Sequence, residues 1–153
     1  MLLVGQDAVH FNRGFAATGL DQRMMRLSSL MDENMLLASG AEATREVYSA
    51  AGYFDALTTE DALDLVGRCT RRFGPDAPVL NSMGESCYED LRLLATLPRR
   101  AGSFDVRTLL HTSESPVGYQ APRGAVHLEK SHLIQPVYLA RADGTMFDVL
   151  TRL

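Results

Sequence analysis

Residues 133–152 read LIQPVYLARADGTMFDVLTR and contain the clearest local signal for the fold. The dipeptide Asp143-Gly144 suits the positive backbone angles of a tight two-residue turn. We therefore expect a β-hairpin at the C-terminal end of the chain, with strands over 133–141 and 146–152.

Residues 125–130 are expected to supply a third strand, which would leave 133–141 in the centre of the sheet. Pro136 conflicts with that order, because proline cannot donate a hydrogen bond to a neighbouring strand and is expected at an edge or a bulge. Either 125–130 pairs only with the half of the strand beyond Pro136, or it belongs to the preceding loop. Residues 113–124 hold two prolines and two glycines and are expected to form that exposed loop.

The first two-thirds of the chain shows a helical pattern. Apolar residues recur every three or four positions, and Ser/Thr residues followed by an acid three positions later suggest helix starts. The expected helices cover 19–38, 41–54, 58–73 and 86–97, with a short turn over 106–110. The sequence thus predicts an α+β fold: about four N-terminal helices followed by a small antiparallel sheet that ends in the hairpin.

The bulk composition is that of an ordinary globular domain. The chain has 153 residues, of which 46% are apolar and 22% charged, so we expect one soluble domain over residues 1–153. No basic region precedes the apolar residues at the start, so we expect no secretory signal and a cytoplasmic location. The two cysteines are expected to be free thiols. A net charge of −4 argues against a broad nucleic-acid interface.

A cluster of histidines is the main candidate for chemistry. His127, Glu129 and His132 lie close in sequence, and with His111 they would form a two-histidine, one-carboxylate metal site or an acid–base cluster. The alternative is that they are polar residues on the exposed face of an edge strand. Cys87 is a further catalytic candidate, because free N–H groups near a helix start stabilise a thiolate. We expect no bound metal or cofactor.

Methionines and arginines are the candidates for binding. Methionine side chains adapt to irregular partner surfaces, and they line the first expected helix. Arginines cluster at the ends of the third and fourth expected helices, where the helix dipole alone would also favour them. The candidate residues for a ligand or partner are Met24, Met31, Met35, Arg71, Arg72, Arg99 and Arg100.

The leading expectation for function follows from the absence of any nucleotide-binding, zinc-binding or triad motif. We expect a non-catalytic regulatory or adaptor module that binds a partner protein or a small apolar ligand, as a homodimer. The alternative is a small metal- or acid/base-dependent enzyme that uses His111, His127, Glu129 and His132. Nucleic-acid binding through the arginines is a third class, and membrane binding is not expected.

Overall fold

The computed structural model describes residues 1–130 and 132–153. Its helices are α1 (Gly5–Ala17), α2 (Glu33–Ser39), α3 (Glu60–Phe73), α4 (Ser82–Ala101) and α5 (Val106–Ser113), with single turns η1 (Leu20–Gln22) and η2 (Ala41–Ala43). Its strands are β1 (Arg26–Ser28), β2 (Val47–Ala51), β3 (Val117–Ala121), β4 (Gly124–Glu129), β5 (His132–Ile134), β6 (Tyr138–Asp143) and β7 (Met146–Arg152). Within the described residues, no helix combines the length and apolar character that a bilayer crossing requires.

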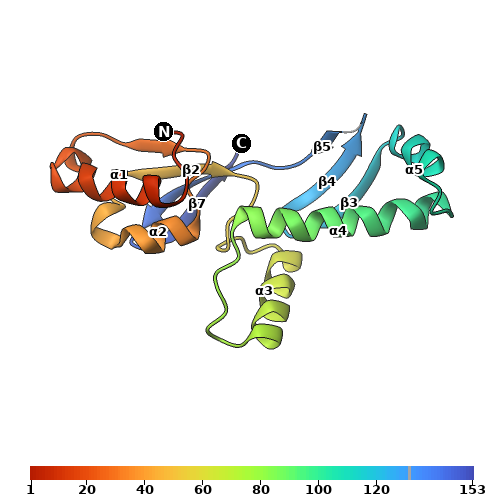
Figure 1. Cartoon of the computed structure of the whole chain (residues 1–153), viewed down its shortest axis with the longest axis horizontal. Coiled ribbons are helices and arrows are strands. Elements are labelled where there is room, and N and C mark those ends of the chain that lie inside the picture. Colours follow the sequence, from red (N-terminus) through yellow and green to blue (C-terminus); the bar gives the residue numbers. More distant parts are fainter. Residues whose placement is uncertain (131) are drawn as a thin grey trace.

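The strands form two sheets. One has the order β1-β2-β6-β7, in which β1 and β2 are parallel and the other pairs antiparallel; the other is an antiparallel β3-β4-β5 sheet. Helices α1 and α2 gather with the four-stranded sheet at one end of an elongated molecule (Figure 1). Helices α4 and α5 accompany the three-stranded sheet at the other end, and α3 projects from the middle (Figure 1).

The expected α+β class and C-terminal hairpin are confirmed. Strands β6 and β7 pair antiparallel up to Asp143 and Met146, so the two turn residues are Gly144 and Thr145. Gly144 has a φ of +63°, a left-handed conformation that glycine adopts without a Cβ clash. The expected third helix is also found as α3, which starts after Thr59 and ends at Gly74.

The expected helices over 19–38 and 41–54 are wrong, because each of these segments contains a strand. Arg26 in β1 is buried, and its guanidinium donates to Asn12 Oδ1 and to the carbonyl oxygen of Ala43. These bonds, with the parallel pairing of β1 and β2, hold the segment extended. Tertiary contacts therefore override the helical spacing of its apolar residues.

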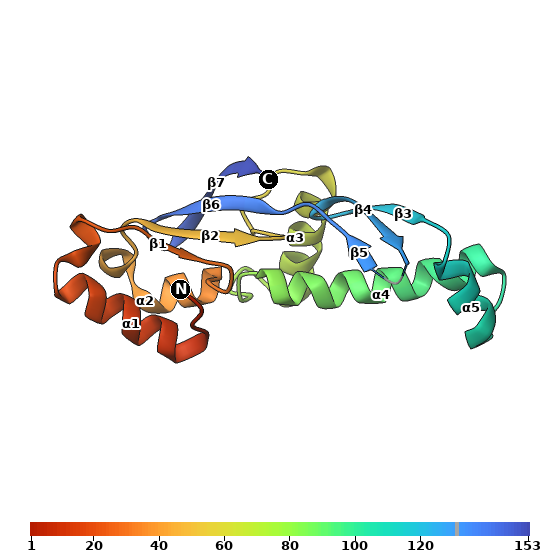
Figure 2. The ribbon, with the colours of Figure 1, turned by 90° about the horizontal axis from the view of Figure 1, so that it is seen from above.

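The hairpin region also differs from the expected sheet order. The segment 133–141 is divided at Pro136 into β5 and β6, which belong to different sheets. Strand β4 pairs with β5, the half before Pro136, rather than the half beyond it. Part of the expected loop 113–124 is strand β3, and α4 continues through Pro98 to Ala101. Figure 2 shows β6 leading from beside β4 and β5 into the four-stranded sheet.

One apolar core spans the four-stranded sheet and the crossover that follows β2. Phe54, from that crossover, packs against Phe147 of β7 with ring centroids 4.9 Å apart. Leu36 of α2 and Val47 of β2 are fully buried in the same cluster. Tyr53 is buried there too, so the residues after β2 belong to the core.

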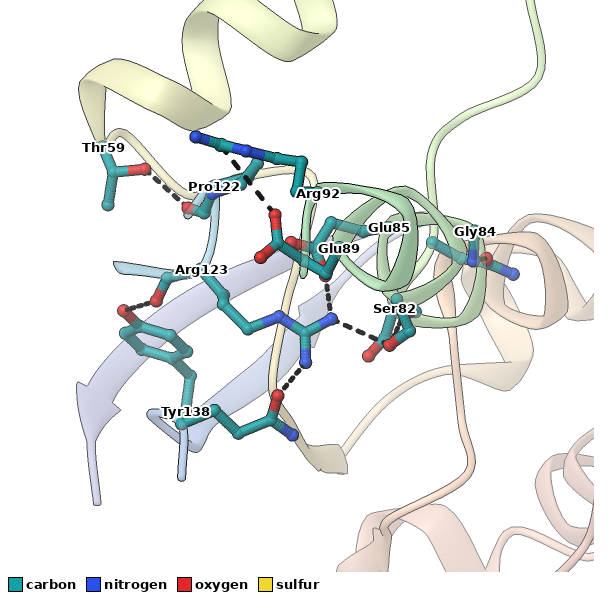
Figure 3. A network of polar contacts seen from close by, with 12 residues as sticks. Thr59, Ser82, Gly84, Glu85, Glu89, Arg92, Pro122, Arg123 and Tyr138 are labelled. Carbon is teal, nitrogen blue, oxygen red and sulfur yellow. Dashed lines mark hydrogen bonds and ion pairs between the residues drawn. The ribbon is translucent and has the colours of Figure 1, made fainter. Parts of the chain in front are cut away.

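A buried arginine joins this core to α4 and the three-stranded sheet (Figure 3). Arg123 lies in the turn between β3 and β4, and its guanidinium pairs with the carboxylate of Glu85 in α4. It also donates to Ser86 Oγ at 2.8 Å and to Gln135 Oε1. The Tyr138 hydroxyl donates to the carbonyl oxygen of Arg123 at 2.7 Å. We call these five residues the Arg123 junction.

The crossover between β2 and α3 passes directly against the Arg123 junction. A Cβ at Gly52 would lie 2.9 Å from Arg123 Nη1, closer than side-chain atoms normally approach. Thr59, at the other end of the crossover, donates to the carbonyl oxygen of Pro122 at 2.6 Å. The junction therefore sets the path of residues 52–59.

We predict that Arg123→Met lowers the free energy of unfolding by about 3–5 kcal/mol, because it leaves the Glu85 carboxylate buried without a counter-charge. The double change Arg123→Met with Glu85→Leu should recover part of that loss. Arg141→Met, which removes an exposed ion pair with Glu46, is the matched control and should cost less than about 1 kcal/mol. Urea unfolding followed by circular dichroism measures all three. Equal losses for Arg123→Met and Arg141→Met would contradict the role of the junction.

Candidate functional site

Two acidic residues follow the carboxyl ends of the parallel strands. Glu33 opens α2, five residues after β1 ends, and Asp55 lies four residues after β2 ends. Because β1 and β2 are parallel, their carboxyl ends meet at one edge of the sheet. In open α/β sheets this edge is where ligands bind. The two carboxylates therefore mark a candidate site.

The start of α2 is held by its neighbours. Asp32 caps the helix: its Oδ1 accepts a hydrogen bond from the backbone N–H of Met35 at 2.9 Å. Its other oxygen accepts from Asn81 Nδ2 at 2.7 Å. Asn81 is itself the N-cap of α4, so one contact ties the two helix starts together. The Glu33 side chain consequently projects from a fixed backbone.

Glu33 contacts the crossover directly. Its Oε1 accepts a hydrogen bond from the backbone N–H of Asp55 at 2.9 Å. Only 6% of Glu33 is exposed, and its Oε2 has no hydrogen-bond partner among residues 1–130 and 132–153. A buried carboxylate oxygen without a donor is costly in a folded protein. Glu33 therefore has unused capacity to accept a hydrogen bond.

A cavity of about 410 Å³ opens beside these two carboxylates. Its volume falls in the range of small-molecule sites, roughly 300–1,000 Å³. Phe147 and Glu33 are buried, whereas Leu37 and Met146 are exposed and form its rim. The lining residues are Glu33, Leu37, Asp55, Ala56, Val79, Thr145, Met146 and Phe147. We call this space the Glu33 cavity.

The environment of the Glu33 cavity disfavours the ionised forms of its two acidic residues, Glu33 and Asp55. Burial raises the pKa of Glu33 from 4.5 to about 7, and the neighbouring carboxylates of Asp32 and Asp55 add to the rise. The hydrogen bond from Asp55 opposes it. Burial also raises the pKa of Asp55. Near neutral pH, Glu33 is thus poised between its protonated and ionised forms.

The candidate histidines and Glu129 lie at the three-stranded sheet and α5, on side chains that are mostly exposed. His127 Nε2 is 3.9 Å from Glu129 Oε2, and Glu129 is the strand partner of His132. His111 instead lies on α5, where it contacts Glu114. The described part of the chain holds no group of three His, Cys, Asp or Glu side chains placed for a metal ion. Cys87 is exposed in the second turn of α4.

The candidate binding residues do not converge either. Met24 is exposed, while Met31 is buried in the core, where its sulfur accepts from Asn12 Nδ2. The sulfur of Met35 accepts from the backbone N–H of Gly5. Arg71 and Arg72 end α3, whereas Arg99 and Arg100 lie in the last turn of α4, and both views place these helix ends apart (Figures 1 and 2).

Sequence reasoning missed Glu33, Asp55 and Arg123. A signal for Glu33 was present, since aspartate is a preferred N-cap residue and Asp32 could have divided the segment 19–38. Once β1 and β2 are read as strands, the acids that follow each become candidates. For Arg123, no local sequence pattern indicates that its side chain is buried.

We predict that Glu33 makes the protein less stable as the pH rises from about 4.5 to 7. The folded state holds this proton more tightly than the unfolded chain, so the unfolded chain binds fewer protons in that window and stability falls. The loss due to Glu33 should approach about 3 kcal/mol and be absent from Glu33→Gln. Glu42→Gln, at an exposed position, is the control and should keep the wild-type profile. Urea unfolding from pH 4 to 8 measures the free energy of unfolding as a function of pH. Identical pH profiles for wild type and Glu33→Gln would contradict the prediction.

Solved structures share this fold. An amino acid ABC transporter substrate-binding protein from Pseudomonas fluorescens Pf-5 superposes with a TM-score of 0.83 at 18% identity, over 99% of this chain and 44% of that one. A solute-binding protein of an ABC transporter from R. palustris, in complex with benzoate, gives 0.81 at 20% identity, over 98% and 41%. A leucine-binding protein from Thermotoga maritima gives 0.79 at 16% identity, over 99% and 43%.

At these identities the similarity establishes the fold alone. The chain spans less than half the length of each of these three structures. Comparison with curated protein sequences gives no match.

A protein-family model identifies the family of the chain, which the similarity in fold does not. It matches residues 1–146 and describes a periplasmic binding protein. The expected cytoplasmic location is therefore wrong, because the family description points to the periplasm. The expected regulatory or adaptor module, with its homodimeric or adaptor partnership, is also wrong, because the matched family is one of periplasmic binding proteins. The alternative, an enzyme built on His111, His127, Glu129 and His132, is wrong for the same reason. The chain belongs to the periplasmic binding protein family.

Proposed function

We propose that this chain takes part in binding a small solute for an ABC-type transporter, and that the solute occupies the Glu33 cavity. The observation that carries the proposal is a cavity of small-molecule size between α2, the segment after β2 and the C-terminal hairpin, with two acidic residues in its lining. Its volume and its mixture of apolar walls with a few polar groups are those of small-molecule sites. Membership of the family and the substrate-binding role printed for the similar structures support it.

The cavity lies where four segments of the chain meet. Glu33 and Leu37 come from α2, Asp55 and Ala56 from the crossover after β2, and Val79 from the segment between α3 and α4. Thr145 and Phe147 come from the turn and the strand at the C-terminal hairpin. A solute held there would contact all four of these segments. Binding should therefore stabilise the whole fold.

We predict that at least one solute from a panel of amino acids, aromatic carboxylates and amines raises the melting temperature in a saturable way. A ligand at a hundred times its Kd stabilises the folded state by about 2.7 kcal/mol. Ala56→Trp, which fills the cavity mouth, should abolish the shift. Ala125→Trp, at an exposed alanine of β4, is the matched control and should retain it.

Thermal-shift assays followed by isothermal titration calorimetry make this measurement. A solute that binds Ala56→Trp as tightly as the unchanged protein would place the site elsewhere. A panel without any binding solute would overturn the proposed function.

We also propose that residues 1–153 form a single cooperative domain. The Arg123 junction and the burial of Tyr53 and Phe54 support it, because both connect the four-stranded sheet to the elements that follow. Urea unfolding should then give coincident transitions by far-UV circular dichroism and by tyrosine fluorescence. Two separated transitions would show that the two sheets unfold independently.

A further inference from the structure

A second cavity lies against α3, next to the Glu33 cavity. Its volume is about 410 Å³, and it is bounded mainly by the second half of α3 and by residues 75–80 of the segment that leads to α4. Figure 1 shows this segment returning along α3 toward the start of α4. We call this space the α3 cavity. A solute confined to the Glu33 cavity would leave it without a role.

The walls of the α3 cavity are apolar, because one face of α3 turns toward it. Four residues at helical spacing share that face: Val66, Cys69, Thr70 and Phe73. Opposite them, the segment contributes Pro75 and Pro78, whose rings fix the backbone angle φ. Of the ten described residues that line the cavity, one, Asp55, is charged. The α3 cavity therefore suits an uncharged, apolar group.

These apolar walls are open to solvent. Phe73 is 69% exposed and Val79 is 40% exposed. Arg72 lies over the Phe73 ring, with Cζ 5.4 Å from the ring centroid, and leaves most of that side chain in water. Burying an apolar group against such residues releases water from both surfaces, which favours binding.

The α3 cavity and the Glu33 cavity meet at two residues. Asp55 and Val79 line both of them. Because Val79 is partly exposed, a ligand can pass over it at the surface without opening the core. Glu33 and Thr145 line the Glu33 cavity alone. A compartment with several polar side chains thus adjoins one whose walls are almost entirely apolar.

We infer that the solute is elongated, with a polar head in the Glu33 cavity and an uncharged alkyl or aryl tail that passes Val79 into the α3 cavity. This inference rests on the proposed function, because it names the solute class for that site. The two volumes together stay below roughly 1,000 Å³, the upper end of the range for small-molecule sites. The polar side chains orient the head, and the α3 cavity selects the tail.

The test compares short and long members of three series: butanoate with octanoate, butylamine with octylamine, and butanol with octanol. Titration calorimetry on residues 1–153 is performed below the critical micelle concentrations. In at least one series, the eight-carbon member should bind roughly tenfold or more tightly than the four-carbon member, because each additional buried CH₂ favours binding.

Thr70→Trp fills the α3 cavity from an exposed position on α3. It should reduce the eight-carbon member to the affinity of the four-carbon member and leave the four-carbon member unchanged. Thr151→Trp, at an exposed threonine of β7, is the matched control and should preserve the difference. Ala77→Trp, also in the lining of the α3 cavity, provides the same test should Thr70→Trp fail to fold.

The outcomes separate this inference from the function on which it rests. A difference between long and short members that persists in both Thr70→Trp and Ala77→Trp would overturn the inference, because the tail would then lie elsewhere. Equal affinities within every series, or no binding by any member, would also overturn it. In each of these cases the Glu33 cavity stands as the solute site if a solute of the first panel binds and Ala56→Trp abolishes that binding.

Discussion

The ion pair between Arg123 and Glu85 is the contact on which the rest of the structure depends. Both side chains are almost completely buried, at 2% and 0% exposure, so neither charge can be solvated by water. Removing ions from water is expensive, and their attraction offsets that cost only when further hydrogen bonds complete the geometry. Ser86, Gln135 and the Tyr138 hydroxyl provide such bonds around Arg123. The pair therefore requires α4, the β3–β4 turn and the start of β6 to be assembled together.

This requirement extends to the candidate site through the crossover. Glycine fits at position 52 because the Arg123 guanidinium occupies the space that a side chain there would need. Three residues further on, the backbone of Asp55 donates to Glu33. The position of the second carboxylate relative to the first thus follows from how the chain passes the junction. A change at Arg123 would alter the cavity without touching any of its lining residues.

The sequence signals correctly predicted the elements whose structure depends on neighbouring residues, namely the C-terminal hairpin and α3. The hairpin at Gly144 requires a left-handed residue, and α3 has a cap at Thr59 and a terminating glycine, so both follow from nearby residues. The segment 19–38 shows the opposite case. Its apolar spacing is helical, yet Arg26 and the parallel neighbour β2 hold part of it as a strand. Without those distant partners, neither β1 nor the role of Glu33 in the residues that follow it could be recognised.

The buried glutamates show why the Glu33 cavity stands out. Glu85 is paired with Arg123, and Glu89, one turn along α4, has Arg92 Nη1 at 4.0 Å (Figure 3). Glu33 is buried to a similar extent, but the residues that line its cavity include no cation. Among the described residues, the fold thus places an arginine beside two of the three buried glutamates, and buried Asp21 likewise has Arg45 Nε at 3.8 Å. The third glutamate, Glu33, is one of the residues that line an open cavity. Because the ionised form of Glu33 makes the fold less stable, the stability of the fold does not explain why an acidic residue stands at this buried position beside a cavity.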